Sequence, residues 1–360
     1  MSLVRTPHPD IHTPDIHTFK ENSMTTSTST QIQLVNRPVG WPTPDDFRTV
    51  AVDLADLAPG EVRVANEFVS VDPYMRGRMI DTRSYVPPFA LGETMTGGAV
   101  GRVVASASDD LPVGTLVLHQ LGWRDVAQAP AAEFTAVPEP PAGTATSVYL
   151  GVLGLTGMTA YVGLTAVAGL KDGDIVFISG AAGAVGSVAG QIAHLLGAAS
   201  VIGSAGGPAK VDLLTSRYGF DAALDYKAAP VRKQLRELAS DGIDVYFDNV
   251  GGDHLEAALD VFNNGGRAAL CGAISSYNET QAQPGPRNMS NIITRGLTLR
   301  GFTLPSYMGL AREFNEKMAA WLADGKIVHD ETVVDGIDHA VDAFLGMMRG
   351  ENVGKMLVRI

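Results

Sequence analysis

The segment 174–186, DIVFISGAAGAVG, joins a short apolar run to a turn of glycine and alanine. Small side chains let a backbone approach a pyrophosphate closely, and a helix that begins at such a turn offers free N–H groups to it. The pattern is Ala181-x-Gly183-x-x-Gly186, with alanine in place of the first glycine. Because a strand precedes the turn and a helix is predicted from about 184 to 196, the segment predicts a dinucleotide site. The alternative is a tight packing turn that binds no ligand.

The residues after the next predicted strand indicate which dinucleotide would bind. An NAD site usually carries a carboxylate near the end of that strand, where it bonds the ribose 2′-hydroxyl. The segment 203–210, GSAGGPAK, has no carboxylate but contains Ser204 and Lys210. A carboxylate would repel a 2′-phosphate and an ammonium would attract it, so the segment predicts NADP, with NADPH as its reduced form. The alternative for Lys210 is a solvated lysine in the first turn of a helix.

The elements that must position these residues differ along the chain. From about residue 31 to 146, the sequence holds short β-branched runs at 61–71, 99–106 and 115–121, separated by glycine, proline and aspartate. No long helical period is present there. This part therefore predicts a mostly β domain in the form of a partly open barrel.

From about residue 147, helical and strand patterns alternate. The segment 149–170 is rich in small residues and predicts a helical connector packed closely between domains. The strands predicted after it are 175–179, 200–204, 222–225, 245–249, 267–272 and 297–302. Helical patterns lie between most of them, and the runs VFISG and AALCG are apolar throughout, as in parallel strands buried on both faces. This part therefore predicts an α/β fold with a doubly wound Rossmann sheet.

The end of the chain predicts a return to the first domain. Two helices are expected at about 306–324 and 337–348, and a final strand at 354–360 joins the β-rich part. The predicted boundaries are 31–146, completed by 325–360, for the catalytic domain and 147–324 for the NADP domain. Residues 1–30 are predicted to be a disordered or leader extension.

Composition argues against several other functions. The net charge of −12 and the absence of a basic stripe argue against a nucleic-acid partner. The single cysteine, Cys271, permits neither an internal disulfide nor a thiolate zinc cage. No apolar run reaches the roughly 18 residues that a membrane span needs. We therefore expect a cytoplasmic protein without a membrane partner.

Motifs spread from about residue 31 to 360 resemble the medium-chain dehydrogenase/reductase superfamily. They are RPVGWPTPDDF (37–47), SVDPYMRGRM (70–79), AAGAVG (181–186), DNVGG (248–252), CGAIS (271–275) and GENVGK (350–355). More narrowly, they resemble its zinc-independent branch of NADPH-dependent alkenal/one reductases, which includes prostaglandin, plant double-bond and curcumin-type reductases. The resemblance implies a chaperonin-10-like catalytic domain beside the Rossmann domain, and a homodimer.

The resemblance also implies which residues hold NADPH. The pyrophosphate would lie on Gly183, Ala184, Val185 and Gly186. Lys210 and Tyr226 would hold the 2′-phosphate and the adenosine end. The other implied contacts flank the nicotinamide or reach the cofactor from the C-terminal part: Asn249, Cys271, Gly272, Ala273, Ile274, Ser275, Phe302, Thr303, Leu304 and Asn352.

Zinc-dependent members of the superfamily carry a Gly-His-Glu motif and a four-cysteine lobe. The corresponding segment here, LGETMTGG at 91–98, has no histidine. A catalytic zinc needs three converging protein ligands, whereas the histidines after residue 100 lie in unrelated contexts. We therefore predict no metal.

Without a metal, hydrogen-bond donors must stabilise the charge that develops when hydride reaches the β-carbon of an enone. That charge lies on the carbonyl oxygen, where the cofactor ribose hydroxyl and a tyrosine hydroxyl are natural donors. We predict that Tyr277 and Tyr74 are catalytic, and that Tyr74, Tyr85 and Tyr307 line the substrate pocket. The alternative for each is an amphipathic residue packed at a domain boundary.

The predicted activity is reduction of the C=C bond of small-molecule enones and enals. Two alternatives remain open: a quinone oxidoreductase of the zeta-crystallin type, and an NADPH-binding protein without turnover. Arg76 and Arg78 are expected to be solvated, with attraction of an acidic substrate tail as the alternative. The loop 276–288, which holds two prolines and a glycine, is predicted to be a mobile cover of the site.

Overall fold

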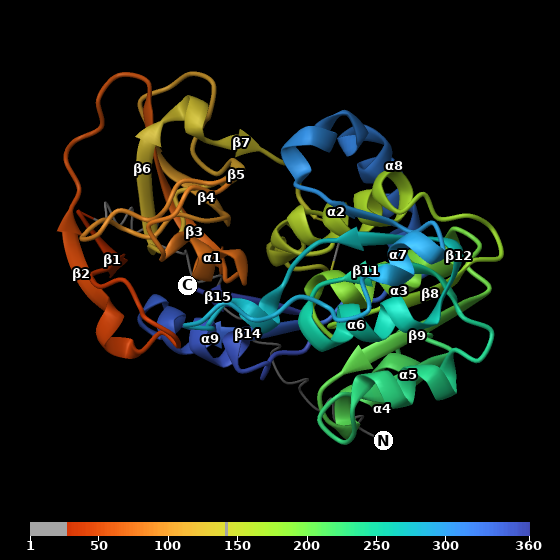
Figure 1. The fold of residues 1–360 in the computed structure, drawn as a ribbon. Coiled ribbons are helices and arrows are strands. Elements are labelled where there is room, and N and C mark those ends of the chain that lie inside the picture. The colour runs from red at the N-terminus through yellow and green to blue at the C-terminus, as the bar shows by residue number, and fades with distance from the viewer. Residues whose placement is uncertain (1–26, 141–142) are drawn as a thin grey trace, which may run out of the picture.

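The computed structural model describes residues 27–140 and 143–360, which form two parts with a β-sheet at the centre of each (Figure 1). The Rossmann part contains a six-stranded sheet in the order β10-β9-β8-β11-β12-β13, and each neighbouring pair is parallel. Its strands are β8 (Ile175–Ile178), β9 (Ser200–Ala205), β10 (Ala222–Asp225), β11 (Ile243–Asp248), β12 (Phe262–Leu270) and β13 (Thr298–Gly301). This is the order of a doubly wound dinucleotide-binding sheet, whose switch point lies between β8 and β11.

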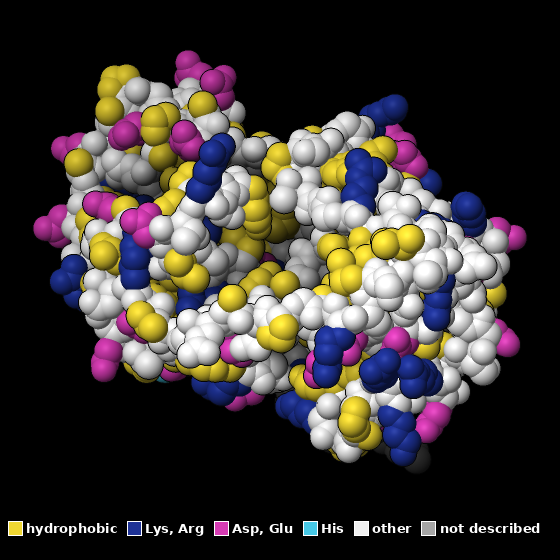
Figure 2. Space-filling model, viewed as in Figure 1, with side chains coloured by type: hydrophobic (Ala, Val, Ile, Leu, Met, Phe, Trp, Pro, Cys, Tyr) yellow, Lys and Arg dark blue, Asp and Glu magenta, His cyan; other side chains and the backbone are white. Residues whose placement is uncertain are grey.

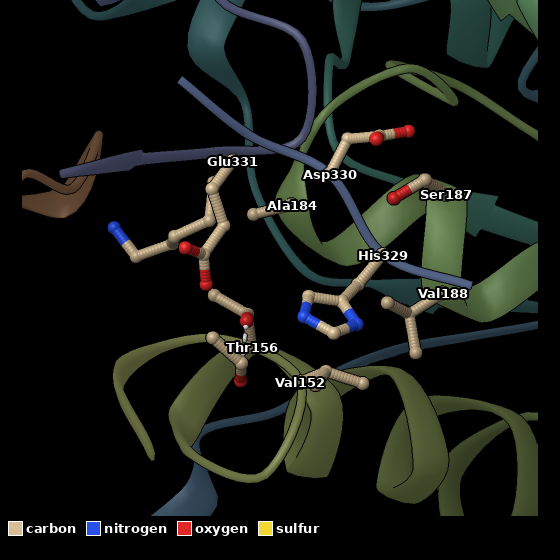
Figure 3. Close-up of a pocket in the computed structure, with 10 residues that line it drawn as sticks. Val152, Thr156, Ala184, Ser187, Val188, His329, Asp330 and Glu331 are labelled. Carbon is tan, nitrogen blue, oxygen red and sulfur yellow. Dashed lines mark hydrogen bonds between the residues drawn. The ribbon is translucent and has the colours of Figure 1, made fainter. Parts of the chain in front are cut away.

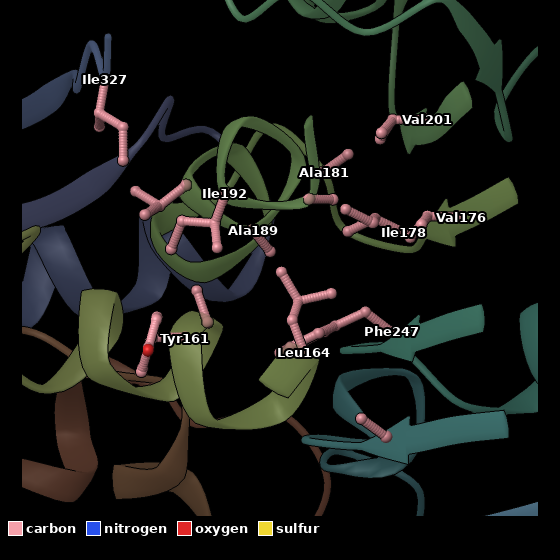
Figure 4. Packing of buried hydrophobic residues seen from close by; sticks show 14 of the residues in the cluster. Tyr161, Leu164, Val176, Ile178, Ala181, Ala189, Ile192, Val201, Phe247 and Ile327 are labelled. Atoms are coloured by element: carbon pink, nitrogen blue, oxygen red, sulfur yellow. The ribbon is translucent and has the colours of Figure 1, made fainter. Parts of the chain in front are cut away.

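Helices cover both faces of this sheet. They are α2 (Leu155–Val162), α3 (Ala184–Leu195), α4 (Pro208–Ser216), α5 (Val231–Leu238), α6 (Gly252–Val261), α7 (Ser290–Thr294) and α8 (Ala311–Ala323). One hydrophobic cluster packs α2, α3 and α8 against the sheet, with Tyr161, Ile192 and Phe247 among its members (Figure 4). A second cluster packs α5 and α6 on the opposite face. Burial on both faces explains the apolar run of β8 and that at the end of β12.

The β-rich part is built around a seven-stranded sheet with a path of six strands. It runs β14-β15-β3-β4-β5-β7, and β6 also pairs with β3. Its strands are β3 (Glu61–Ser70), β4 (Ala99–Ser106), β5 (Leu116–His119), β6 (Val126–Pro130), β7 (Thr135–Ala136), β14 (Glu331–Asp335) and β15 (Lys355–Arg359). Because β15 pairs antiparallel with β3, the last strand of the chain joins the β-rich part. A separate pair of strands, β1 (Thr28–Leu34) and β2 (Phe47–Asp53), and the helices α1 (Tyr74–Arg78) and α9 (Ala340–Met348) complete it.

Two expectations about single elements need correction. The connector 149–170 is not one helix: a 3₁₀ helix (Thr146–Leu150) precedes α2, and a π-helical turn (Gly163–Val167) follows it. The glycines of the connector do allow close packing, because a Cβ on Gly163 would lie 2.3 Å from Phe247. The helix expected at 306–324 begins as a 3₁₀ helix (Leu304–Leu310) before α8.

The predicted N-terminal extension, 1–30, is too long by three residues, because β1 begins at Thr28. The rest of that prediction lies outside the described residues. Within the described part of the chain, no helix is long and apolar enough to cross a membrane.

Candidate functional site

The predicted cofactor residues follow the carboxyl ends of the parallel strands. The turn 180–186 follows β8, Asn249 follows β11, and the segment 271–277 follows β12. Because the strands are parallel, these segments share one edge of the sheet. Tyr226 follows β10 and Phe302 follows β13 at the same edge. The structure therefore brings together residues that are more than 100 positions apart.

The turn at residues 180–186, called the glycine turn below, packs tightly under α3. A Cβ added to Gly186 would lie 2.4 Å from the Gly180 carbonyl oxygen and 2.7 Å from Ala181 Cα. Gly183 is the N-cap residue of α3 and has no side chain to cap the helix. The first backbone amides of a helix have no partner within it. The glycine turn therefore has the close backbone approach and the free donors that suit a pyrophosphate.

Residues 350–354, called the C-terminal segment below, lie directly against the glycine turn. Gly354 N donates to Ala182 O at 2.8 Å, and Gly354 forms a parallel bridge with Gly183. Gly354 has φ +63°, and a Cβ there would lie 1.8 Å from Asp330 O, so only glycine fits. The segment that carries Asn352 is thus held beside the expected pyrophosphate position.

Lys210 lies in the first turn of α4 and contacts the same segment. Its Nζ donates to Gly350 O at 2.7 Å and to Asn352 O at 2.6 Å. The pKa of Lys210 is lowered by burial and by the nearby Lys227 ammonium. Tyr226 lies against the backbone that follows β9. A Cβ added to Gly206 would lie 2.6 Å from the Tyr226 hydroxyl oxygen. Two cations and a tyrosine therefore gather where a 2′-phosphate is expected.

The switch point is organised by the buried carboxylate of Asp248. Its Oδ1 accepts hydrogen bonds from the Tyr246 hydroxyl (2.7 Å), Ser179 Oγ (3.1 Å) and the N–H groups of Val250 (2.9 Å) and Gly251 (2.8 Å). Burial nevertheless raises the pKa of Asp248. Asn249 Nδ2 donates to Ser179 O at 2.7 Å. These bonds fix the backbone between β8 and β11, where dinucleotides bind in doubly wound sheets.

The segment 271–277 turns back on the end of β11. Cys271 N donates to Asp248 O, and Ser275 Oγ donates to Val250 O at 2.6 Å. Burial raises the pKa of the Cys271 thiol to about 12, so this thiol stays protonated and cannot serve as a nucleophile at neutral pH. The Tyr277 hydroxyl lies beside this backbone and accepts a long hydrogen bond, 3.4 Å, from Ala273 N.

Three of the four predicted tyrosines line one cavity of about 160 Å³, called the tyrosine cavity below. The surface is hollowed between the two parts, with hydrophobic side chains on its wall (Figure 2). The residues that line the cavity are Tyr74, Gly77, Arg78, Ser84, Tyr85, Val86 and Tyr277. Six of them belong to the β-rich part, and Tyr277 comes from the Rossmann part. The cavity therefore forms only where the two parts meet.

Burial raises the pKa of all three of these tyrosine hydroxyls, and most strongly that of Tyr74. The Asp72 carboxylate adds to the shift at Tyr74, whereas the Arg78 guanidinium opposes it. Each hydroxyl therefore remains protonated well above neutral pH. In that state it can donate a hydrogen bond to an oxygen on which negative charge develops.

Tyr307 lies elsewhere, on the 3₁₀ helix Leu304–Leu310. Its ring centroid is 6.2 Å from that of Phe302, and the Arg300 guanidinium lies over it. Leu304 is buried in the Rossmann core, and Phe302 packs against that core. Thr303 is the N-cap residue of the same 3₁₀ helix. The roles expected for these residues stay predictions.

Arg76 is not solvated as expected, and Arg78 is only partly exposed. Arg76 is only 2% exposed. Arg78 donates from Nε to Pro87 O and from Nη2 to Thr96 Oγ1, both at 2.9 Å, and stacks 4.0 Å from the Phe89 ring. With its donors in use, Arg78 is a poor receptor for an acidic substrate tail. The sequence indicated that both side chains are charged, but not that backbone carbonyl oxygens accept hydrogen bonds from them.

The buried histidines are engaged by protein groups. His119 Nε2 lies 2.8 Å from Asn66 Oδ1, and its Nδ1 accepts from Leu121 N. His254 Nε2 lies 2.8 Å from Ser204 Oγ. In residues 27–140 and 143–360, no group of three or more His, Cys, Asp or Glu side chains could hold a metal ion.

A second, much smaller cavity lies beneath the glycine turn, between α2 and the first turn of α3 (Figure 3). Glu331, His329 and Thr156 line it, and its volume of about 10 Å³ suits one water molecule. Ser147 Oγ donates to Glu331 Oε2 at 2.7 Å, whereas Glu331 Oε1 has no partner among the described residues. This cavity is too small for a substrate, so the tyrosine cavity is the candidate substrate site.

Comparison with known proteins agrees with this arrangement. A family model described as the N-terminal domain of oxidoreductase matches residues 30–137, and one described as zinc-binding dehydrogenase matches residues 184–324. The NADPH-dependent curcumin reductase of Escherichia coli is 38% identical, with 91% of this chain and 95% of that protein covered. Prostaglandin reductase 1 of Bos taurus is 40% identical, with 89% and 96% covered.

The chain belongs to the NADPH-dependent alkenal/one reductases of the medium-chain dehydrogenase/reductase superfamily. Among solved structures, CurA from Vibrio vulnificus in complex with NADPH matches with a TM-score of 0.87 and 41% identity, covering 92% of this chain and 98% of that one. The family resemblance and the fold predicted from the sequence are thus confirmed. The description "zinc-binding dehydrogenase" applies to a segment that lies within the Rossmann part.

Several site residues escaped the sequence analysis. Lys227 approaches Lys210 because β10 lies next to β9, and an order for the strands would have been needed to place it there. Asp248 was visible only as part of the motif DNVGG, and nothing in the spacing indicated four hydrogen bonds to its carboxylate. Gly354 contacts the glycine turn from 170 residues away, and one sequence carries no signal for such a contact.

Proposed function

We propose that this protein reduces the C=C bond of α,β-unsaturated ketones and aldehydes with NADPH by donating tyrosine hydrogen bonds to the substrate carbonyl. The observation that carries this mechanism is the tyrosine cavity, where three protonated hydroxyls surround a space of about 160 Å³. Tyr277 in its lining belongs to the segment that turns back on the nucleotide switch point. The names of the relatives, curcumin reductase and prostaglandin reductase, support the substrate class.

The carboxyl edge of the sheet fits NADPH. The glycine turn would hold the pyrophosphate, Lys210, Lys227 and Tyr226 would hold the phosphorylated adenosine end, and the segment 271–277 with Asn249 would flank the nicotinamide. Bound NADPH supplies the hydride from its nicotinamide C4. The absence of a carboxylate in 203–210 and the paired ammonium groups favour the 2′-phosphate over a bare 2′-hydroxyl.

The chain itself contributes charge stabilisation and exclusion of water. Tyr277 and Tyr74 donate hydrogen bonds to the carbonyl oxygen, on which negative charge grows as the β-carbon accepts hydride. Losing one such donor typically costs roughly 3 kcal/mol of transition-state stabilisation. Tyr85 covers the cavity from the loop of the β-rich part. The α-carbon is then protonated by water or by one of these tyrosines.

The test is a product assay with three acceptors: a linear enone, an enal and a naphthoquinone, each with NADPH. We expect NADPH consumption and a saturated ketone or aldehyde, identified by mass spectrometry. Tyr277→Phe and Tyr74→Phe should each lower kcat roughly 100- to 1,000-fold. Tyr149→Phe is the control, because the Tyr149 hydroxyl donates to Pro138 O away from the cavity.

The other outcomes distinguish the alternatives. Turnover of the quinone alone would favour a zeta-crystallin-type quinone oxidoreductase, and NADPH binding without any turnover would favour a non-catalytic protein. Unchanged kcat in both tyrosine variants would show that neither hydroxyl is the hydrogen-bond donor proposed here.

We also propose a zinc-independent site, a two-domain division and a homodimer. Residues 31–146 with 325–360 would form the catalytic domain and 147–324 the nucleotide domain, a division that the pairing of β15 with β3 supports. For the dimer, β13 ends the six-stranded sheet and leaves one edge available for pairing with a second copy. Light scattering after gel filtration tests the dimer, and metal analysis of the active enzyme tests zinc.

A further inference from the structure

Arg76 belongs to the same short helix as Tyr74 and Arg78, but its guanidinium serves a different neighbourhood. Its Nε donates to Asn278 Oδ1 at 2.9 Å, across 202 residues of sequence, and its Nη2 donates to Gly40 O at 2.7 Å. Asn278 follows β12 in the Rossmann part, whereas Gly40 and Arg76 belong to the β-rich part. This side chain therefore bonds one part of the protein to the other.

The two loops that Arg76 joins also touch each other. Gly40 has φ +77°, and a Cβ added to it would lie 3.3 Å from Thr280 Cγ2 and 3.8 Å from Asn278 O. We call Arg76, Gly40 and Asn278 the Arg76 clasp. Arg76 is 2% exposed, so its charge is removed from water. Hydrogen bonds of this kind offset the free-energy cost of burying that charge. Its Nη1 is buried without a hydrogen-bond partner among the described residues, and the charge of the nearby Asp46 carboxylate also favours the charged guanidinium.

Tyr277 is the immediate neighbour of Asn278. Tyr277 and Ile274 belong to the Rossmann part but pack against the hydrophobic core of the β-rich part. Within its own segment, the Tyr277 hydroxyl has only the 3.4 Å bond from Ala273 N. The position of this ring in the tyrosine cavity therefore depends on contacts that cross between the two parts.

We propose that Arg76 is a positioning residue, which holds Asn278 so that the hydroxyl of Tyr277 faces Tyr74 and Tyr85 across the tyrosine cavity. The inference rests on the proposed function, in which Tyr277 donates a hydrogen bond to the substrate carbonyl. Arg76 itself touches neither substrate nor cofactor. Its substitution moves the donor, and a displacement of about 1 Å in a reacting group can cost about 100-fold in rate.

The first test is a double-mutant cycle on enone turnover with Arg76→Met and Tyr277→Phe. Methionine keeps the apolar length of the side chain and removes the donors. We expect Arg76→Met to lower kcat 10- to 100-fold in the wild-type background but less than about 2-fold in Tyr277→Phe, because the hydroxyl that it positions is already missing. The KM for NADPH should change less than kcat does, since the glycine turn and Lys210, which would hold the phosphates of the cofactor, lie outside the clasp. Equal losses of kcat in both backgrounds would refute the positioning role.

Two companion variants sharpen this result. Asn278→Ala removes the acceptor of the clasp and should reproduce the loss of kcat, whereas Arg76→Lys should restore little, because one ammonium cannot reach both acceptors as a fork. Arg312→Met is the matched control, since the Arg312 side chain is 90% exposed on α8. Normal turnover in Asn278→Ala would overturn the proposal.

The second test needs no turnover, so it separates the clasp from the proposed function. Hydrogen exchange of the backbone amides of 274–280 is measured in NADPH-saturated protein. Arg76→Met should speed exchange there at least 10-fold and leave α3 and α5 unchanged. Unchanged exchange in 274–280 refutes the clasp even if the enzyme reduces enones. Faster exchange in a protein that reduces no enone supports the clasp while the proposed function fails.

Discussion

Lys210 should discriminate NADPH from NADH, and the structure shows what else its removal would disturb. Its ammonium donates to Gly350 O and Asn352 O at 2.7 and 2.6 Å, and Lys227 lies close enough to lower its pKa. Lys210→Met keeps the apolar stem and removes the charge. With NADPH, the variant loses both the phosphate contact and the two carbonyl bonds. With NADH, it loses the carbonyl bonds alone.

The two losses differ in size. A hydrogen bond to a charged group contributes about 1.5–3 kcal/mol, so loss of the phosphate contact should raise the KM for NADPH roughly 10- to 150-fold. The carbonyl bonds hold a segment that is also fixed by the bond from Gly354 N to Ala182 O. Their loss should therefore cost less than about 1 kcal/mol of binding, or about 5-fold in the KM for NADH.

The assay is steady-state enone reduction with each cofactor at saturating enone, in wild type and Lys210→Met. Lys233→Met is the control, because Lys233 is an exposed residue of α5. The KM for NADH divided by the KM for NADPH should fall toward one in Lys210→Met. In the control this ratio should stay as in wild type. An equal rise of both KM values would refute the reasoning, because it would assign Lys210 to the C-terminal segment alone.

Three further predictions follow from single contacts. Gly186→Ala should weaken NADPH binding at least about 10-fold in a fluorescence titration, because its Cβ would lie 2.4 Å from a carbonyl oxygen, whereas Gly309→Ala has open space and should not. Burial lowers the pKa of His119 to about 3 and that of His254 to about 4. Because both pKa values are lowered in the folded protein, the free energy of unfolding falls as the pH drops from 6.5 toward these values. The free energy of unfolding measured with urea should therefore fall about 2 kcal/mol less between pH 7 and pH 5 in His254→Gln than in wild type. Cys271, with its raised pKa, should react with iodoacetamide at pH 8 at least about 100-fold more slowly than free cysteine.

The sequence predicted best those strands that are buried on both faces of the sheet. Strands β8 and β9 are buried almost throughout, so each can be recognised from its own composition without knowing its neighbours, whereas β13 (TLRG) is largely exposed. The strand predicted at 222–225 coincides with β10, and that at 175–179 differs from β8 by one residue. The strands β1 and β2 were not predicted, because β1 buries polar residues such as Ser29 and Gln31, and β2 buries only Phe47 of its seven residues. The predicted helical connector is helical from Leu155 to Val167, and it is interrupted only before Leu155, where Gly154 has a non-helical backbone.

The candidate site was predictable as a set of motifs but not as a set of contacts. Each motif follows a strand end, and the shared edge of a parallel sheet makes their meeting a consequence of the fold. The tyrosines could be named from their segments, but their common cavity depends on how the two parts meet. Arg76 shows the limit most clearly. Its charge predicted a solvated side chain, and only the structure reveals that Asn278 and Gly40 replace the lost water.

Lys210 and Arg76 each form hydrogen bonds between the two parts of the protein, one from each part. Lys210 extends from the Rossmann part to the C-terminal segment, whereas Arg76 extends from the β-rich part to the loop after β12. Hydrogen bonds of charged groups are roughly twice as strong as neutral ones, so separation of the parts is resisted at both ends. A 2′-phosphate that binds Lys210 must share or replace the carbonyl oxygens of Gly350 and Asn352. The proposed phosphate contact and the position of the C-terminal segment would therefore depend on the same ammonium, so Lys210→Met should affect both.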